Sequence, residues 1–307
     1  MPANEILVVG SINMDLVFRL PRLPQKGETV GGGEFAAYPG GKGANQGVAA
    51  ARLGVSTGLV GCVGQDEWGN ALIEGLRLEG VDTAWVQRVP GPSGCAGIYV
   101  GPRGENSIAV APGANSRLEA AFPAGAREAI SQARVLLTQL EIPLESVEAA
   151  LRLAKKGGVT TILDPAPARA LPPALLALVD YLTPNALEAS ALTGIEVHCW
   201  NTAAQAARQL RGQGAGTVIV TMGKLGAFFS SPQGQVRIPA PAATVVDATA
   251  AGDAFNGAFA AALTRGVAPD EAADLGAVAG ALAVTKKGAQ PSLPRLADLR
   301  EAVAVPW

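Results

Sequence analysis

Short apolar runs alternate with segments of helical length along most of the chain, and this alternation constrains the fold more than any other feature of the sequence. Such runs are typical of strands that are buried on both faces of a parallel sheet, and the segments between them are long enough for the connecting helices. The pattern therefore predicts an α/β fold with a mainly parallel central sheet. Strands are expected at residues 6–9, 58–63, 135–140, 159–163, 181–183 and 218–221, and helices at residues 42–53, 70–78, 144–155, 186–192, 202–211, 252–264 and 270–284.

Two stretches interrupt the alternation, at residues 14–38 and 95–110. Both are punctuated by glycine and proline, and both contain short runs such as D-L-V-F-R-L and A-G-I-Y-V-G, which are typical of additional strands. We expect them to form a small β-sheet lid at the ligand-binding edge of the large sheet, because structureless insertions of this length are uncommon in compact domains. Two long surface loops are the alternative. Without an evident linker, the chain is expected to form a single domain over residues 1–307.

The charge balance and the cysteines limit the partners and the compartment that suit this chain. It carries 24 Lys and Arg against 26 Asp and Glu, so no strong positive field would gather nucleic acid or anionic lipid. No apolar stretch approaches the roughly 20 residues of a membrane span, and the N-terminus lacks the basic flank of a signal peptide. The three cysteines give no disulfide framework. We therefore expect a cytoplasmic protein that binds neither nucleic acid nor membranes.

The histidine content restricts the chemistry further. His198 is the only histidine, so triads based on histidine, two-histidine iron sites and histidine-rich zinc sites are excluded. Catalysis would have to use carboxylates, lysine, backbone amides or a hard cation.

The strongest catalytic candidate is the segment D-A-T-A-A-G-D at residues 247–253, which leads into a helix of small residues. Gly252 at a helix start lets backbone amides approach an anion closely, and the helix dipole adds partial positive charge, so a phosphate would fit there. Asp253 beside these amides suits a general base that takes a proton from a nucleophile attacking that phosphate. An acid that merely favours the helix start explains Asp253 equally well.

The segment G-G-K-G-A-N at residues 40–45 offers backbone amides, a cation and a carboxamide to a polyol. It is not a Walker A loop, because Gly43 follows Lys42 where that motif needs Ser or Thr, and Ala36 stands where it needs its first Gly. No G-x-G-x-x-G follows the first predicted strand, which argues against a nucleotide dehydrogenase. Phosphoryl transfer without a P-loop remains open.

Polar side chains also follow the first and third predicted strands. Asn13 and Asp15 lie on one face of an extended segment and would bracket neighbouring hydroxyl groups, although a turn-forming pair is the alternative. Glu141 follows an apolar strand, where a parallel sheet presents its functional side chains. Their shared position at strand ends favours a functional site.

Two more strand ends suit a nucleotide. Asn185 and Glu188 have the spacing of a capping box, which would also account for both residues. Thr221, Gly223 and Gly226 supply a hydroxyl and two glycines, suitable for the phosphates of a nucleotide or for an ordinary turn.

Several motifs follow one another in a defined order: V-V-G-S-I-N-M-D, P-G-G-K-G-A-N-Q, Q-L-E-I-P, D-P-A-P-A-R, T-P-N-A-L-E, T-M-G-K-L-G, D-A-T-A-A-G-D-A-F-N-G and T-K-K-G-A-Q-P-S. In these motifs the chain resembles the PfkB carbohydrate kinases, and among them the ribokinase branch, nearly from end to end. The resemblance implies a ribokinase-like three-layer α/β sandwich with a β-sheet lid that closes over the sugar and pairs with the lid of a second subunit in a homodimer. It also implies that ATP phosphorylates the 5-hydroxyl of D-ribose to give D-ribose 5-phosphate.

The resemblance also assigns roles to residues. Asp253 becomes the catalytic base, and the anion hole for the γ-phosphate is formed by the backbone amides of Ala250, Ala251, Gly252 and Asp253. The matching sugar-binding residues are Asn13, Asp15, Gly41, Lys42, Asn45, Glu141 and Asp253. Those around ATP are Asn185, Thr221, Gly223, Gly226 and Gly252, while Glu188 organises Mg²⁺ through water. A K⁺ ion would be held, mostly through backbone carbonyls, by Asp247, Thr249, Ala283, Lys286, Gly288 and Ser292.

Two positions depart from the usual ribokinase pattern. Asp164 replaces the Asn of N-P-A-P-A, and Ala277 stands where a larger polar residue can flank adenine, so the nucleotide preference stays open. The alternatives are another PfkB kinase, acting on deoxyribose, fructose or a nucleoside, and a sugar-sensing homologue without catalysis. Asn13 favours a sugar with a 2-hydroxyl, and the presence of both Gly252 and Asp253 disfavours the sensor.

Overall fold

The computed structural model describes residues 4–102 and 106–303 and has a nine-stranded sheet at its centre. All neighbouring strands pair in parallel except the last two at one edge, which are antiparallel. This arrangement confirms the predicted α/β fold with a mainly parallel sheet. In spatial order the strands are β13 (Gln235–Ile238), β12 (Ala227–Ser230), β11 (Thr217–Thr221), β10 (Tyr181–Leu182), β9 (Thr160–Leu163), β8 (Val135–Thr138), β1 (Ile6–Val9), β4 (Thr57–Gly64) and β5 (Val81–Val89).

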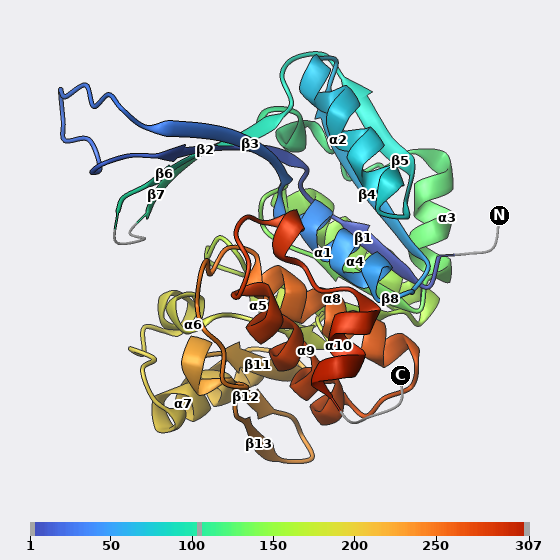
Figure 1. The fold of residues 1–307 in the computed structure, drawn as a ribbon. Coiled ribbons are helices and arrows are strands. Elements are labelled where there is room, and N and C mark those ends of the chain that lie inside the picture. The colour runs from blue at the N-terminus through green and yellow to red at the C-terminus, as the bar shows by residue number, and fades with distance from the viewer. Residues whose placement is uncertain (1–3, 103–105, 304–307) are drawn as a thin grey trace.

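Helices cover both faces of this sheet (Figure 1). One face packs against α1 (Lys42–Arg52), α2 (Glu67–Leu78), α8 (Ala251–Thr264), α9 (Pro269–Ala283) and α10 (Leu296–Ala302). The other packs against α3 (Ala124–Gln132), α4 (Leu144–Gly157), α5 (Pro173–Leu176), α6 (Ala186–Thr193) and α7 (Trp200–Gly212). Short 3₁₀ helices are η1 (Gly113–Arg117), η2 (Gly223–Leu225) and η3 (Gln290–Ser292).

The alternation of side chains along β1 explains why the sheet needs two helical layers. Ile6 and Val8 belong to one hydrophobic core, while Leu7 and Val9 belong to the other, and all four are fully buried. Successive side chains of a strand point to opposite faces, so an uninterrupted apolar run must be covered on both. None of the helices in the described ranges is long and apolar enough to cross a bilayer.

A second sheet of four strands reaches away from the body of the molecule (Figure 1). In spatial order it contains β3 (Glu34–Gly40), β2 (Asn13–Arg19), β6 (Gly94–Val100) and β7 (Asn106–Ala111). The small sheet predicted from residues 14–38 and 95–110 is therefore present, although residues 103–105 of that prediction lie outside the described residues. We call this sheet the lid.

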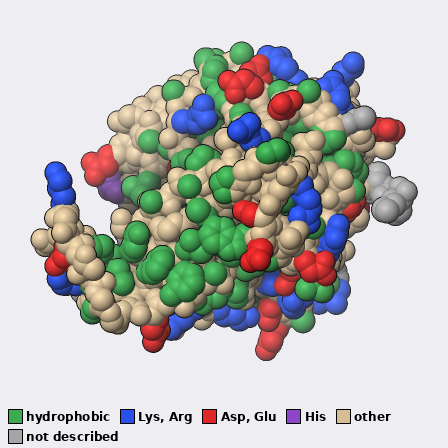
Figure 2. Space-filling model, turned by 90° about the horizontal axis from the view of Figure 1, so that it is seen from above, with side chains coloured by type: hydrophobic (Ala, Val, Ile, Leu, Met, Phe, Trp, Pro, Cys, Tyr) green, Lys and Arg blue, Asp and Glu red, His purple; other side chains and the backbone are tan. Residues whose placement is uncertain are grey.

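The lid carries its own aromatic cluster. Phe18 stacks on Tyr99, with ring centroids 5.6 Å apart, and it also contacts Phe35 at 5.1 Å. Phe35, Ile108 and Val110 remain 60%, 54% and 50% exposed. Figure 2 shows hydrophobic side chains gathered on the face seen from above, toward the end of the molecule from which the lid projects. The lid thus exposes several large apolar side chains to solvent.

Candidate active site

The site begins where α1 and α8 meet, because both helices start at the carboxyl edge of the central sheet. Small residues let them pack closely: a side chain at Gly257 would strike Ala49 and the backbone of Gln46. At the start of α1, a side chain on Gly43 would similarly strike the backbone of Gly10, just after β1. The first turns of the two helices are therefore held together, and their polar side chains can reach one another.

Asp253, in the first turn of α8, lies at the centre of this contact. Its Oδ2 accepts a hydrogen bond of 2.9 Å from Nδ2 of Asn45, and its Oδ1 accepts one of 3.0 Å from Nε2 of Gln46. The carboxyl is only 5% exposed. Burial raises its pKa and nearby Glu141 adds to the effect, although Lys42 and the two amides oppose the rise. A raised pKa makes Asp253 a better proton acceptor than an ordinary surface aspartate.

Glu141 and Asp15 extend the site toward the lid. Oε2 of Glu141 accepts hydrogen bonds from Oγ of Ser11 at 2.6 Å and from the backbone N–H of Lys42 at 3.3 Å. Asp15 lies on β2 and is buried. Its pKa rises to about 7, chiefly because of burial and then because of the charges of Glu141 and Asp253. Asp15, Glu141 and Asp253 are therefore close enough for their charges to influence one another.

Lys42 and Gly41 complete the start of α1. Burial alone would lower the pKa of Lys42, but the carboxylates of Asp164, Asp253, Glu141 and Glu188 outweigh burial and raise it, so the side chain stays charged. Gly41 has a positive φ of 88°, and a side chain there would collide with the backbone of Asn13. The structure thus brings together all the residues that the sequence predicts for sugar binding.

Asn45 retains an unused hydrogen-bonding atom at this site. While its Nδ2 binds Asp253, its buried Oδ1 has no partner among the described residues. Burying an unpaired carbonyl oxygen is unfavourable unless a ligand or water supplies a donor. Its position beside Asp253 makes a hydroxyl group of the substrate the natural donor.

Asn115 is a functional candidate that sequence reasoning missed. It lies on η1, is buried, and donates from Nδ2 to Oδ1 of Asn13 at 2.7 Å. Its own Oδ1 accepts from the backbone N–H of Ile12 at 2.9 Å. Because the oxygen of Asn13 is engaged, the NH₂ group of Asn13 is the end that can donate to a sugar. The only available signal was an asparagine after Pro-Gly, which is also common in simple turns.

Three further buried side chains stand behind the base and were not predicted as site residues. Gln46 lies on α1, Gln139 follows β8 and Asp164 follows β9. Nε2 of Gln46 donates to Oδ2 of Asp164 at 2.8 Å, and Oε1 of Gln46 accepts from Nε2 of Gln139 at 2.5 Å. Burial raises the pKa of Asp164, and the charges of Glu188 and Asp253 raise it further against the opposing charge of Lys42.

A cavity of about 610 Å³ opens on the other side of α8. Its lining is largely apolar and small, which suits a flat base such as adenine. Among the lining residues are Thr221, Gly223, Gly226, Gly252, Phe255 and Ala277. A side chain at Gly252 would meet nothing, so an anion can approach the start of α8 from this cavity. The predicted ATP residues of this group therefore line a single space.

Asn185 and Glu188 form the capping box that was one interpretation of their spacing. Oε2 of Glu188 accepts from the backbone N–H of Asn185, and Oδ1 of Asn185 accepts from that of Glu188, both at 2.8 Å. The backbone of Asn185 pairs with Thr221, which places the start of α6 beside the nucleotide cavity. Their roles toward ATP and Mg²⁺ stay predictions.

The residues predicted to hold K⁺ lie on two segments that Asp247 joins. Oδ1 of Asp247 accepts from the backbone N–H and the hydroxyl of Thr249, at 3.0 and 2.6 Å, and Oδ2 accepts from the N–H of Gly288 at 3.0 Å. Burial would raise the pKa of Asp247, but these hydrogen bonds outweigh it and lower the pKa. Ala283 ends α9 just before Lys286, whose N–H it accepts at 3.2 Å. Backbone oxygens of this kind suit a hard cation.

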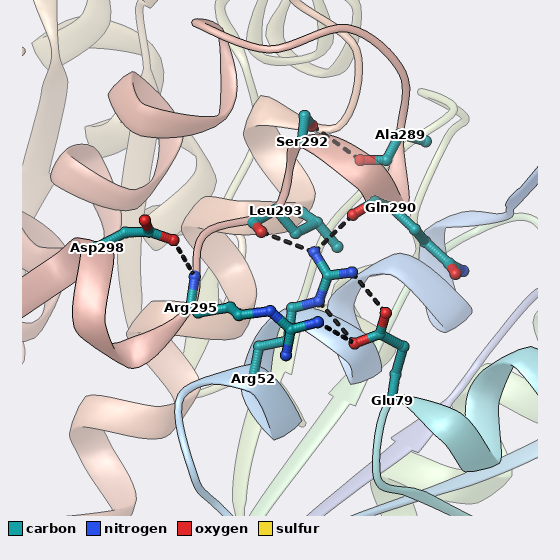
Figure 3. Close-up of polar contacts among 8 residues, drawn as sticks. All are labelled: Arg52, Glu79, Ala289, Gln290, Ser292, Leu293, Arg295 and Asp298. Atoms are coloured by element: carbon teal, nitrogen blue, oxygen red, sulfur yellow. Dashed lines mark hydrogen bonds and ion pairs between the residues drawn. The ribbon is translucent and has the colours of Figure 1, made fainter.

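Ser292, the last of these predicted ligands, lies on η3, which is anchored from the far end of α1 (Figure 3). Arg52 donates to the backbone oxygens of Gln290 and Leu293, both at 2.7 Å, and forms a two-pronged ion pair with Glu79 at 2.7 and 2.8 Å. The Arg52 side chain is 8% exposed. The helix that carries Asn45 at its start thus fixes η3 at its end.

No group of three or more His, Cys, Asp or Glu side chains is arranged to hold a metal ion within residues 4–102 and 106–303. The ligands predicted for K⁺ are mainly backbone oxygens. The absence of a side-chain metal cluster from the described residues therefore says nothing about the K⁺ prediction. His198 is exposed in the loop before α7.

Comparison with known proteins places this site in a family. The model of the pfkB family of carbohydrate kinases matches residues 3–296. The chain is 43% identical over 292 residues to a ribokinase from Haemophilus influenzae, covering 95% of each, and 35% identical over 303 residues to a deoxyribokinase from Salmonella typhi, covering 98% of this chain and 99% of that protein. The structure of Arabidopsis thaliana ribokinase complexed with ribose and ATP is similar at a TM-score of 0.91 with 34% identity, covering 98% of both chains. The fold and these similarities together show that the chain belongs to the pfkB family of carbohydrate kinases.

Proposed function

We propose that the protein is an ATP-dependent kinase that phosphorylates the 5-hydroxyl of D-ribose. The observation that carries this proposal is the position of Asp253: its buried carboxyl accepts from Asn45, and Gly252, just before it, lines the cavity suited to a nucleotide. A ribokinase is 43% identical to this chain, and the similar ribokinase complex contains ribose and ATP. We therefore assign the sugar to the polar side chains beside Asp253 and the nucleotide to the cavity that Gly252 lines.

In the proposed reaction, Asp253 takes the proton of the sugar hydroxyl as its oxygen attacks the γ-phosphorus. The new O–P bond forms as the bond to the β-phosphate oxygen breaks, and ADP leaves. Negative charge on the transferred group would be stabilised by the backbone amides from Ala250 to Asp253 and by the dipole of α8. Ala250 has a positive φ of 60°, which turns the backbone at the point where these amides begin.

The polar space under the lid orients the sugar. Asn13 would donate from its NH₂ group, while Asp15 and Glu141 would accept from neighbouring hydroxyls. Asn45 would accept through its unpaired oxygen. Lys42 would place its charge near the transferred phosphate. This set of donors and acceptors matches a polyol better than an apolar substrate.

Mg²⁺ and K⁺ belong to the same proposal. When bound, these ions would neutralise charge on the transferred phosphate and on the loop beside the anion hole. Glu188 uses Oε2 in the capping box, so Oε1 would hold a water ligand of Mg²⁺. The segments joined by Asp247 would offer backbone oxygens to K⁺, together with Thr249 and Ser292.

We further infer that residues 1–307 act as one domain and that the chain forms a homodimer through the lid. The exposed apolar side chains of Ile108 and Val110, which share one face of the lid, support the dimer, because burying them against a second lid would remove them from water. We place the protein in the cytoplasm, where ATP is abundant and where unpaired thiols such as those of Cys62, Cys95 and Cys199 persist. Binding of nucleic acid or membranes forms no part of the proposal.

The main alternative is a preference for 2-deoxyribose, as the name of the Salmonella typhi relative suggests for that protein. Asn13 argues against it, because its NH₂ group would lose a partner if the 2-hydroxyl were absent. The experiment is a kinase assay with ATP across ribose, 2-deoxyribose, fructose and adenosine, with ³¹P NMR identifying the product. We expect ribose 5-phosphate to form fastest. A different preferred substrate, or none, would contradict the proposal.

A further inference from the structure

A chain of buried side chains runs behind the catalytic carboxylate. It leads from Gln139 through Gln46 to two acids, Asp164 and Asp253, which share the single NH₂ group of Gln46 at 2.8 and 3.0 Å. Both glutamines are fully buried. Asp164 contributes no group to the phosphoryl transfer described above. It is nevertheless buried, and only the side chain of Gln46 separates it from Asp253.

The hydrogen-bonding chemistry of these groups determines the orientation of the side-chain amide of Gln46. An ionised carboxylate only accepts hydrogen bonds, and a carboxyl that carries a proton on its far oxygen still accepts through the near one, so two carboxyl groups on the same side favour the NH₂ end of the amide. If the amide were reversed, its oxygen would face both acids, and Gln139 would have to turn its own oxygen toward the NH₂ of Gln46. Asp164 therefore favours the orientation in which Gln46 donates to Asp253.

An asparagine at this position would restrict Gln46 less. A carboxamide can present either its oxygen or its NH₂ group, so it is compatible with both orientations of the neighbouring amide. The carboxylate of Asp164 removes this ambiguity. The cost is a second buried acid close to Asp253, which is unfavourable unless the orientation it enforces is useful.

We propose that Asp164 is a positioning residue for the phosphoryl transfer: through the amide of Gln46, it holds the Asp253 carboxylate in the plane from which it accepts the proton of the sugar hydroxyl. This inference rests on the proposed role of Asp253. Gln46 holds Oδ1 and Asn45 holds Oδ2, so the carboxylate is fixed at both oxygens. Without Asp164, the NH₂ group of Gln46 loses one of its two acceptors, so its orientation toward Oδ1 of Asp253 is less restricted.

The test is a double-mutant cycle with Asp164→Ala, Gln46→Ala and the double variant, assayed on the sugar that the parent phosphorylates best. We expect Asp164→Ala to lower kcat about tenfold, because small misplacements of catalytic groups cost up to about 100-fold. The dissociation constant of the sugar, measured by calorimetry without nucleotide, should change less than about threefold, because the sugar-binding side chains are untouched. In the Gln46→Ala background, Asp164→Ala should have no further effect on kcat.

Two variants separate this role from a structural one. Asp164→Asn keeps an oxygen that can accept from Gln46 but can also present its NH₂ group, so it should recover only part of kcat. Asp164→Leu is similar in volume but has no hydrogen-bond acceptor, so it should not recover kcat. It replaces Asp164→Ala in the cycle if the alanine variant fails to fold. Ser146→Ala, which removes a buried hydroxyl that donates to the backbone oxygen of Leu118, should lower Tm and leave kcat unchanged.

Additive effects of Asp164→Ala and Gln46→Ala would overturn the inference, because Asp164 would then act without Gln46. An unchanged kcat in both Asp164→Ala and Asp164→Leu would overturn it as well. Either result leaves the proposed kinase function standing, since the parent would still be active. A parent that phosphorylates no sugar would overturn the function and this inference together.

Discussion

Nδ2 of Asn115 donates a hydrogen bond of 2.7 Å to Oδ1 of Asn13, and thereby determines which end of the Asn13 amide faces the sugar space. The two residues are 102 positions apart, one on η1 and the other at the start of the lid strand β2. Asn13 is consequently a donor and not an acceptor toward the ligand. The choice between ribose and its 2-deoxy analogue should depend on this pair.

Ribose should exceed 2-deoxyribose in kcat/KM by about tenfold or more, because the analogue leaves the NH₂ group of Asn13 unpaired at a cost of about 1–3 kcal/mol. Asn13→Met should narrow or reverse the ratio, since a thioether needs no partner. Steady-state kinetics with both sugars measures this. Equal use of the two sugars by the parent, or an unchanged ratio in Asn13→Met, would make Asn13 a turn residue only.

Asn115→Asp should also narrow that ratio, although residue 115 lies behind Asn13. The carboxylate keeps the acceptor for the N–H of Ile12 but faces Oδ1 of Asn13 with an oxygen, which favours reversal of the Asn13 amide. The same kinetic comparison applies, with Ser116→Ala, an exposed neighbour on η1, as the control. A ratio equal to that of the parent would show that Asn115 does not orient Asn13.

Asp253→Asn should lose general-base catalysis, which is typically worth about 10² to 10⁴ in rate. The substitution is nearly isosteric, so Tm and sugar binding should change little. Single-turnover assays and calorimetry measure the two effects separately. Turnover within about threefold of the parent would refute the assignment of the base, while a large fall in Tm would indicate that the acid mainly supports the start of α8.

Asp15→Asn should stabilise the ligand-free protein in a pH-dependent manner. Because the folded state raises the pKa of Asp15 from 3.8 to about 7, the folded protein binds its proton more tightly than the unfolded chain does. The parent should therefore lose stability as the pH rises from about 4 to 7, by on the order of 4 kcal/mol from this group. Urea unfolding should show similar stabilities near pH 4 and a more stable variant at pH 8.

The control for this prediction is Asp274→Asn, which alters an exposed acid on α9 and should leave the pH dependence of unfolding as in the parent. A stability difference between Asp15→Asn and the parent that is the same at every pH would contradict the prediction. It would mean that the carboxyl of Asp15 does not take up a proton on folding.

Arg52→Met should destabilise the fold by about 1–3 kcal/mol, because backbone oxygens lose a donor while Glu79 keeps its ion pair with Arg295. Here Glu79 and the backbone oxygens of Gln290 and Leu293 would all lose a donor. Arg152→Met removes an exposed pair with Glu148 on α4 and should cost less than about 0.5 kcal/mol. Urea unfolding compares the two variants, and equal costs would contradict the buried role of Arg52.

Much of the fold could be predicted because buried parallel strands leave uninterrupted apolar runs in the sequence. β5 was missed because it is an edge strand whose sequence, V-D-T-A-W-V-Q-R-V, mixes polar and apolar residues and is only partly buried. The helix expected at 70–78 begins at Glu67, because Asp66 caps it by accepting from the N–H of Gly69 at 2.7 Å. Its apolar periodicity becomes visible only after that first turn.

The site was predicted where single residues follow strand ends, and it was missed where residues act in pairs. Asn45 and Asp253 lie in recognisable glycine-rich segments. Gln46 sits beside Asn45 in the same motif, but its partners Gln139 and Asp253 are 93 and 207 positions away. Asn115 likewise acts on a residue 102 positions distant. Hydrogen bonds between such distant side chains leave no periodicity or spacing in the sequence.

The close packing of α1 on α8 has a consequence for how the enzyme can diversify. Because Gly257 leaves no room for a side chain between these helices, Asp253, the proposed base, and the side-chain amides of Asn45 and Gln46 are held in fixed positions. Asn13 and Asp15, in contrast, are carried by β2, a strand of the projecting lid. New sugar specificities are therefore most accessible through substitutions in the lid strands. Such substitutions can change the side chains that face the sugar without changing the positions of α1 and α8.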